Sequence, residues 1–355
     1  MRTPRLCSLL AAGLAAAISL NGHAAAKTDF SVCWTIYAGW MPWEYGEAEG
    51  IVDKWAKKYD INIDVVQIND YVESINQYSA GQFDGCTMTN MDALTIPAAG
   101  GIDSTALIIG DFSNGNDGVV VKGENKSLAD LKGQPVNLVE LSVSHYLLAR
   151  GLESVGLSEK DLSVVNTSDA DLVAAFATDE VKAVTTWNPL LAEVEATPGV
   201  TKVFDSSQIP GEIIDLMVVN SDTLKDNPAF GKALTGAWYE IMATMSADNA
   251  AGKAAREHMA KASGTDLAGY EAQLAATKMF YAAKDAVAFA TSPALPATMS
   301  KVAAFSHTHG LLGEGASSDQ AIGMSFANEV STGDQGNLKL RFDPSYMQMA
   351  ADGAL

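Results

Sequence analysis

The chain has 355 residues, and its 43 Asp and Glu residues outnumber its 23 Lys and Arg residues, giving a formal net charge of −20 at pH 7. Nucleic acid is excluded as a natural partner, because contacts to phosphate groups need clustered basic side chains. The length suits one large or two medium-sized domains. The acidity is typical of a soluble exported protein.

Residues 1–26 have the pattern of a secretory signal peptide. Arg2 and Arg5 make the start positive, residues 6–20 are largely apolar, and residues 23–26 end in small side chains. This pattern predicts cleavage after Ala26 and a periplasmic location. No later apolar run is long enough to cross a bilayer.

Two cysteines, Cys33 and Cys86, lie beyond this segment, and both fall in apolar, strand-like runs. An exported protein meets an oxidising compartment, where such a pair can form a disulfide. Buried free thiols would explain the same positions. The sequence leaves both interpretations open, and no Cys/His cluster offers a zinc site.

From residue 27 onward, strands alternate with helices. We expect strands over 30–36, 61–68 and 83–88, an aromatic loop over 37–46, helices over 51–59 and 71–80, and another helix from residue 90. Strands that alternate with helices at this spacing indicate a parallel sheet covered on both faces.

A Gly/Asn/Asp-rich segment, 111–118, lies between the apolar runs 106–109 and 119–121. A single helical turn over 127–133, a strand over 136–139 and a helix over 144–155 follow. This order is expected where a chain leaves one α/β lobe and starts another. Further strands over 162–165 and 181–186, with a helix over 169–177, continue the second lobe.

The apolar run 213–219 is expected to return the chain to the first lobe. Ala-rich helices over 228–245, 250–262 and 267–289 should pack on that lobe, with a short strand over 338–344. The predicted organisation is therefore signal peptide 1–26, the first part of lobe 1 over 27–115, lobe 2 over 116–217, and the return to lobe 1 with C-terminal helices over 218–355.

In open α/β sheets, ligands bind where strands end and loops lead into helices. Two lobes built this way predict a cleft for a small molecule between them. The candidate ligand-binding residues on the facing loops are Trp34, Trp43, Glu44, Asn90, Asp92, Asp111, Glu140, Ser142, Ser144, Trp187, Asn188 and Asp215.

The charges on these loops are one-sided. No Lys or Arg occurs in 30–50, 83–112, 134–149, 183–200 or 203–219, whereas acids occur in each. An anion would call for a basic side chain, although helix N-termini can substitute in part. The pattern favours a neutral polar or cationic ligand, and aromatic faces beside carboxylates suit a planar N–H donor.

Several candidates have a purely structural alternative. Trp34 and Trp187 can belong to the core, Asp92 suits the first turn of a helix, and Asp111 and Asp117 suit turns. Asp215 is unusual because a carboxylate within an apolar run needs a partner.

Signals for catalysis are weak, since the sequence contains no GxSxG, no HExxH and no phosphate-binding glycine loop. His145 begins a predicted helix, and the pair His307 and His309 offers too few ligands for a metal. We expect a protein that is not an enzyme and that has no cofactor or metal.

Three motifs carry a family resemblance: GNDGVVV at 115–121, SLADLKG at 127–133 and VKAVTTWNP at 181–189. With them, the chain resembles the periplasmic substrate-binding proteins of ABC importers of the nitrate/sulfonate/taurine (NitT/TauT) type. The resemblance implies an α/β type II periplasmic-binding-protein fold with two lobes, a hinge and an interlobe cleft. It also implies a monomer that delivers a small molecule to the transmembrane permease.

The segments CWTIYAGWMPW at 33–43 and MTNMD at 88–92 resemble the subgroup of urea- and guanidine-type binding proteins associated with urea carboxylase pathways. Asn188 departs from many relatives, which carry an acid there. Between the two ligands, guanidinium explains acidic loops better than neutral urea does. Two alternatives stay open: the same fold binding a sulfonate or nitrate, and a pyrimidine-precursor synthase, which would need a Lys/His pair and a Cys-rich iron motif.

Overall fold

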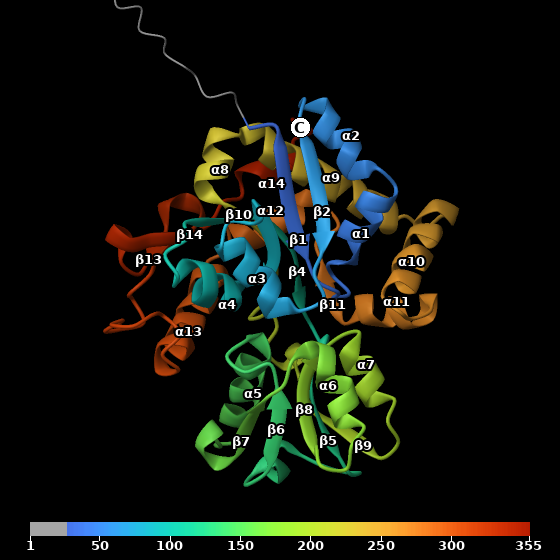
Figure 1. The fold of residues 1–355 in the computed structure, drawn as a ribbon, viewed down its shortest axis with the longest axis vertical. Helices are drawn as coiled ribbons and strands as arrows, with labels where there is room; N and C mark the ends of the chain where they lie inside the picture. The colour runs from blue at the N-terminus through green and yellow to red at the C-terminus, as the bar shows by residue number, and fades with distance from the viewer. Residues whose placement is uncertain (1–26) are drawn as a thin grey trace, which may run out of the picture.

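The computed structural model describes residues 27–355, so the predicted signal peptide lies outside the described residues. The chain forms two α/β lobes, each built on its own sheet (Figure 1). The nine-stranded sheet of lobe 1 has the order β13-β12-β14-β4-β10-β3-β1-β2, with β11 paired to β4. The five-stranded sheet of lobe 2 has the order β7-β6-β8-β5-β9.

The strands of lobe 1 are β1 (Asp29–Trp34), β2 (Asn62–Gln67), β3 (Gly85–Thr89), β4 (Ser104–Ser113), β10 (Ile214–Asn220), β11 (Thr277–Met279), β12 (Gly323–Ser325), β13 (Ser331–Thr332) and β14 (Leu338–Phe342). Its helices are α1 (Met41–Ala48), α2 (Ile51–Lys58), α3 (Tyr71–Ser79), α4 (Asn90–Ala93), α8 (Ser221–Asp226), α9 (Pro228–Met245), α10 (Ala250–Ala262), α11 (Leu267–Ala275), α12 (Ala283–Ala290), α13 (Ala294–Thr308) and α14 (Ser345–Ala351). β1 pairs in parallel with β2 and β3, and β10 runs antiparallel between β3 and β4. β4 is buried along nearly its whole length, as a central strand covered on both faces should be.

Lobe 2 contains β5 (Asp117–Lys122), β6 (Pro135–Leu138), β7 (Ser163–Asn166), β8 (Ala183–Trp187) and β9 (Val200–Asp205), with helices α5 (Val143–Ser154), α6 (Asp169–Phe176) and α7 (Leu190–Glu195). Short helical turns occur at Leu128–Leu131 and Glu159–Asp161. β6 pairs in parallel with β7 and β8, whereas β5 is antiparallel to both β8 and β9.

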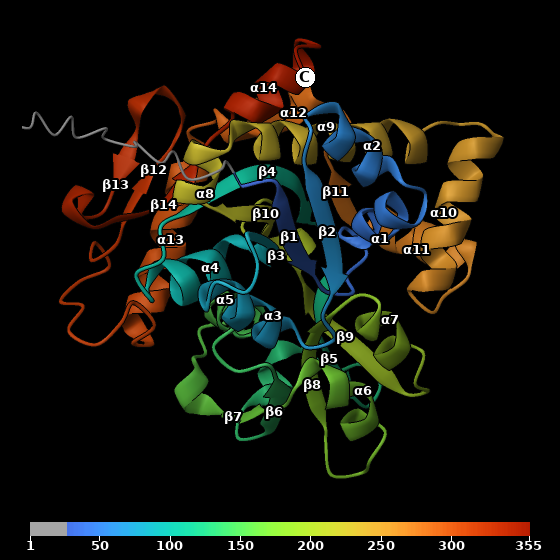
Figure 2. The ribbon, with the colours of Figure 1, turned by 45° about the horizontal axis from the view of Figure 1, so that its top comes forward.

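The chain passes from lobe 1 to lobe 2 between β4 and β5 and returns between β9 and β10 (Figure 2). The two crossings touch: the hydroxyls of Ser113 and Ser206 lie 2.6 Å apart, and the Gly115 amide donates to Ser206 Oγ at 2.7 Å. Hydrogen bonds between the crossings hold them together at the point where the lobes would hinge.

Two expectations from the sequence, for residues 37–46 and 267–289 of lobe 1, were wrong. Residues 37–46 are not all loop, because α1 starts at Met41, and Pro42 in its first turn fits a helix start. The expected helix over 267–289 is interrupted by β11, which pairs with the end of β4 through Met279 and Asp111. Pairing with a distant strand overrides the local Ala-rich pattern there.

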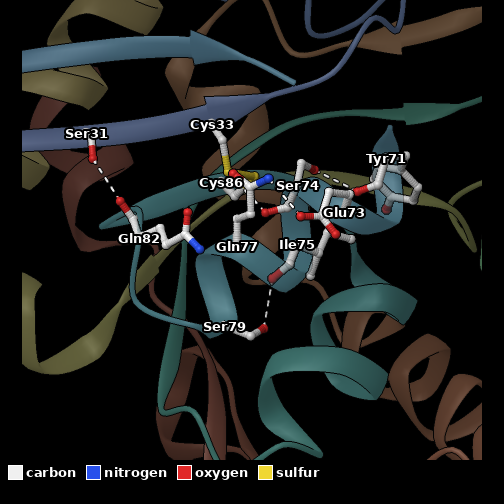
Figure 3. Close-up of a disulfide and its surroundings, with 10 residues drawn as sticks. All are labelled: Ser31, Cys33, Tyr71, Glu73, Ser74, Ile75, Gln77, Ser79, Gln82 and Cys86. Carbon is white, nitrogen blue, oxygen red and sulfur yellow. Dashed lines mark hydrogen bonds between the residues drawn. A yellow bond between two sulfur atoms is a disulfide. The ribbon is translucent and has the colours of Figure 1, made fainter. Parts of the chain in front are cut away.

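Cys33 and Cys86 form a disulfide, which settles the choice that the sequence left open. They are directly opposite each other on β1 and β3, with Cα atoms 4.4 Å apart. Figure 3 shows the bond among residues of α3, including Ser74 and Ile75. None of the helices within residues 27–355 has the length and apolar character needed to cross a membrane.

Candidate ligand-binding site

A small cavity lies where the two lobes meet, and side chains of both lobes line it. Its lining residues are Tyr37, Trp40, Tyr71, Thr89, Asp117, Val143, Trp187, Ile213 and Asp215. The cavity volume is about 20 Å³, counted as space open to the centre of a water-sized sphere. One water needs roughly 10–15 Å³ by this measure, so the cavity in its present form holds one or two water-sized groups and must widen for a larger ligand.

Strand ends bring the polar lining together. Thr89 ends β3 and lies opposite Asp215 near the start of β10, which in turn lies opposite Asp111. In lobe 2, Trp187 ends β8 and lies opposite Asp117, the first residue of the antiparallel β5. Both sheets therefore present a carboxylate at the edge that faces the other lobe.

Aromatic rings form a continuous wall across the interlobe boundary. Trp187 of lobe 2 packs edge-on to Tyr71 of lobe 1, with ring centroids 5.6 Å apart. Tyr71 lies 5.7 Å from Trp40, and Trp40 lies 5.1 Å from Tyr37. Such faces bind planar groups and cations.

Four buried carboxylates surround this wall: Asp92, Asp111, Asp117 and Asp215. Burial raises the pKa of Asp92 to about 6 and the pKa of both Asp111 and Asp117 to about 7. Burial, and then the charge of Asp111, raise the pKa of Asp215 well above its usual range. No Lys or Arg is among the residues that line the cavity.

The carboxylates around the aromatic wall accept fewer hydrogen bonds than buried carboxylates need. Asp92 accepts from the hydroxyls of Tyr71 (2.7 Å) and Thr89 (2.8 Å), and Asp111 accepts from Tyr37 at 3.3 Å. Asp111 and Asp215 face each other and can share a proton, because the pKa of each is raised. Apart from such a proton, Asp92 Oδ1, Asp111 Oδ2 and Asp215 Oδ2 have no hydrogen-bond partner within residues 27–355. Buried unpaired acceptors are costly, and a ligand rich in N–H groups would satisfy them.

Gly39 allows this crowding. A Cβ atom at position 39 would lie 2.5 Å from Asp111 Oδ2 and 2.7 Å from the Tyr37 ring. Only a glycine therefore lets the backbone approach the Asp111 carboxylate so closely.

The candidate residues from the sequence fall into two groups. Trp187 and Asp215 line the cavity, and Asp92 and Asp111 stand directly behind it. Ser142 caps α5 by accepting from the Ser144 amide at 3.2 Å, so both serines flank Val143, which lines the cavity. Asn188 follows Trp187 and donates to Asn116.

The other candidates do not line the cavity. Trp34 is buried at the end of β1, and Trp43 packs on Trp238 at 5.1 Å. Glu44 pairs with His258, and Glu140 is exposed. Asn90 is buried and bonds the backbone of Glu212 and Ile214, which fixes the returning crossing to lobe 1.

Sequence reasoning did not select several residues that line the cavity. Asp117 suits a turn in the sequence and does not follow a strand, whereas in the structure it begins β5 at the cavity. Tyr37 and Trp40 belong to the expected aromatic loop, from which only Trp43 and Glu44 were candidates. Tyr71, Thr89, Val143 and Ile213 carried no signal that distinguished them from ordinary core or cap positions.

Comparison with known proteins gives a family match. The family model described as NMT1/THI5 like matches residues 55–249. A protein of Brucella abortus (strain 2308), named as a binding protein, is 28% identical over 139 residues, which are 38% of this chain. The alignment spans only 43% of that relative's length.

Solved structures match over most of the chain. The periplasmic aliphatic sulphonate-binding protein of Escherichia coli has a TM-score of 0.67 at 18% identity, covering 82% of this chain and 95% of that one. The periplasmic nitrate-binding protein of Synechocystis PCC 6803 has a TM-score of 0.57 at 12% identity, covering 93% and 99%. At these identities the likeness is one of fold, and it confirms the type II periplasmic-binding-protein fold.

Proposed function

The chain belongs to the NMT1/THI5-like family, and from that premise we propose that it is the periplasmic solute-binding protein of an ABC importer. It captures a small nitrogenous compound, guanidinium- or urea-like, between its lobes and delivers it to the permease. The observation that carries the proposal is the set of buried carboxylates with unpaired oxygens around an aromatic cavity that no basic residue lines.

Size and shape support a compact planar ligand. The cavity is small, and its walls include the rings of Trp187, Tyr71, Trp40 and Tyr37. Guanidinium and urea are planar and present N–H groups around their edge. They can stack on a ring while donating in the plane to carboxylates.

Charge favours guanidinium over urea. Asp117 and Asp215 reach the cavity itself, and Asp92 and Asp111 lie behind it. A cation replaces the protons that these buried acids otherwise hold, and charge-assisted hydrogen bonds are about twice as strong as neutral ones. Neutral urea can donate to these carboxylates, but it carries no positive charge to compensate theirs.

An oxyanion such as nitrate or a sulfonate is the second candidate, because the N-terminus of α5 reaches the cavity at Val143. Helix N-termini bind anions. Here, however, the buried Asp92 lies beside the Val143 amide at this helix end, and a carboxylate there repels an anion. A helix end already occupied by a carboxylate supports the cationic ligand.

A binding role is also favoured over catalysis. A pyrimidine-precursor synthase would need a Cys-rich iron motif, and Cys33 and Cys86 are joined in the disulfide. Trp187, Val143 and Asp117 of lobe 2 already lie against lobe 1 around the cavity, which is the arrangement expected when a solute carrier closes on its ligand.

Thermal unfolding with a ligand panel tests the proposal. Guanidinium, at micromolar to low-millimolar levels, is compared with urea, nitrate and taurine. A ligand at 100 times its Kd stabilises the protein by about 2.7 kcal/mol. We expect a shift with guanidinium that Asp215→Asn abolishes and that the exposed control Asp179→Asn retains. A shift with nitrate or taurine alone would overturn the proposed ligand class.

A further inference from the structure

A second polar cluster joins the lobes away from the ligand cavity, where α13 of lobe 1 packs on α5 of lobe 2. Phe305 of α13 lies edge-on to Tyr146 of α5, with ring centroids 5.2 Å apart. Beside it, His309 at the end of α13 meets His145 of α5 and Glu159 of the turn Glu159–Asp161. We name these three residues the His–Glu–His clasp.

The hydrogen bonds of His309 determine its charge. Its Nδ1 lies 2.9 Å from the Phe305 carbonyl oxygen, and its Nε2 lies 2.7 Å from Glu159 Oε2. A carbonyl and a carboxylate only accept, so both hydrogen bonds form together only when both ring nitrogens carry a proton. Burial raises the pKa of Glu159, but its contacts with His145 and then His309 lower that pKa by more, so this carboxylate is ionised.

His145 lies against the other oxygen of the same carboxylate. Its Nε2 contacts Glu159 Oε1, and its Nδ1 accepts from the Leu141 amide at 3.1 Å. Because Nδ1 accepts, the proton of a neutral ring is on Nε2, facing Glu159. Two imidazoles and a carboxylate are side chains that can bind Zn²⁺. Here, however, the Nε2 atom of His145 carries a proton and has no free lone pair for a metal.

The other charged side chains nearby pair with one another, so Glu159 is the counterion of His309. Arg150 pairs with Glu153 and Glu212, and Lys301 bonds Glu212 at 2.7 Å. These basic and acidic groups neutralise one another around the same open cavity of about 610 Å³, which Glu159 and His309 also line. Within residues 27–355, no other ionised group is recorded in contact with the His309 ring.

We propose that the His–Glu–His clasp is a proton-dependent lock between the lobes, which stabilises the closed form and so tightens ligand binding in the cavity. The inference rests on the proposed function, because closure matters only if a ligand is captured. His309 and Glu159 act as positioning residues: they touch each other across the boundary and not the ligand. A ligand and a clasp that both favour the closed form reinforce each other.

The sign of the pH effect follows. The clasp needs a proton on both nitrogens of His309, so it is present at lower pH and is lost as pH rises. The acids of the ligand cavity respond in the opposite sense, since they bind a cation better when deprotonated. The informative quantity is therefore the ratio of Kd values between a variant and the wild type at one pH, in which the cavity acids cancel.

The test measures the guanidinium Kd by calorimetry at about pH 6 and about pH 8.5. His309→Gln keeps a donor but loses the charge, and Glu159→Gln removes the counterion. His307→Gln, two residues earlier on α13, is the matched control. We expect either clasp variant to bind about tenfold more weakly at the lower pH and nearly normally at the higher pH. His307→Gln should stay within about twofold, and the double variant should be no weaker than either single variant.

A ligand-free measurement separates failure of the clasp from failure of the proposed function. Imidazole ¹⁵N shifts of His309 should report a doubly protonated ring that loses this state at lower pH in Glu159→Gln, whatever the ligand is. A neutral His309 at about pH 6, or equal Kd ratios at both pH values, would overturn the clasp. Stabilisation by ZnCl₂ that His309→Gln removes would overturn it in favour of a metal site.

Discussion

Asp117→Asn should make the ligand-free protein more stable while weakening ligand binding. Asp117 is 3% exposed and lines the cavity, and its pKa is raised by burial from 3.8 to about 7. An acid with a raised pKa holds a proton in the folded state that the unfolded chain has released. Folding stability therefore falls as pH rises from about 4 to about 7, and the full loss is present above that range.

The size of the stability change follows from the pKa shift of Asp117. At 1.36 kcal/mol per pKa unit, moving the pKa from 3.8 to about 7 costs roughly 4 kcal/mol of stability at pH 8. An asparagine avoids this cost, so Asp117→Asn should raise the thermal unfolding midpoint by several degrees at pH 8 and hardly at all near pH 4. The same change removes a charge-assisted hydrogen bond and should weaken guanidinium binding at least tenfold.

The assay is thermal unfolding across this pH range, paired with calorimetric titration of guanidinium. Asp179→Asn, at an exposed position of the same lobe, controls for the loss of one negative charge. If Asp117→Asn is less stable than the wild type at pH 8, or binds guanidinium equally well, the reasoning about buried carboxylates fails.

Other consequences can be measured on the same protein. Guanidinium binding near pH 6 should release protons, because bound cation deprotonates Asp111 and Asp117, whose pKa values are about 7; the binding enthalpy should therefore differ between buffers of different ionisation enthalpy, and equal enthalpies would contradict this. Reducing the bond between Cys33 and Cys86, 53 residues apart, should cost about 4 kcal/mol of unfolding free energy while leaving the ligand Kd unchanged once the protein is folded. Glu140→Gln should bind guanidinium within about twofold of the wild type, because Glu140 is exposed and does not line the cavity; a large loss would place it at the ligand.

Local patterns predict most of the secondary structure because apolar runs and caps act over short distances. The strand expected over 181–186 is observed as β8, and the helix expected over 71–80 as α3. β11 could not be found in this way, because three residues within an Ala-rich stretch become a strand only by pairing with β4. The helix α1 was not predicted, because the glycines, the aromatic residues and Pro42 in 37–46 also suit a loop.

The site residues also divide into those that a local pattern indicates and those that depend on distant pairing. Asp215 belongs to the first group, because a carboxylate in an apolar run needs a partner, and it lines the cavity. Asp117 looked like a turn residue because the sequence does not reveal that β5 is antiparallel and begins at the cavity. The contact between His309 and Glu159, 150 residues apart, depends on how two helices of different lobes pack.

The most direct test of the proposed ligand is calorimetric titration of the full chain with guanidinium, urea, nitrate and taurine in parallel, near pH 7.5. The buried carboxylates predict saturable binding of guanidinium, weaker binding or none for urea, and none for nitrate or taurine. If nitrate or taurine binds saturably and guanidinium does not bind, the proposal of a site for a cation is contradicted. The buried acids around Trp187 would then not be ligand-binding groups.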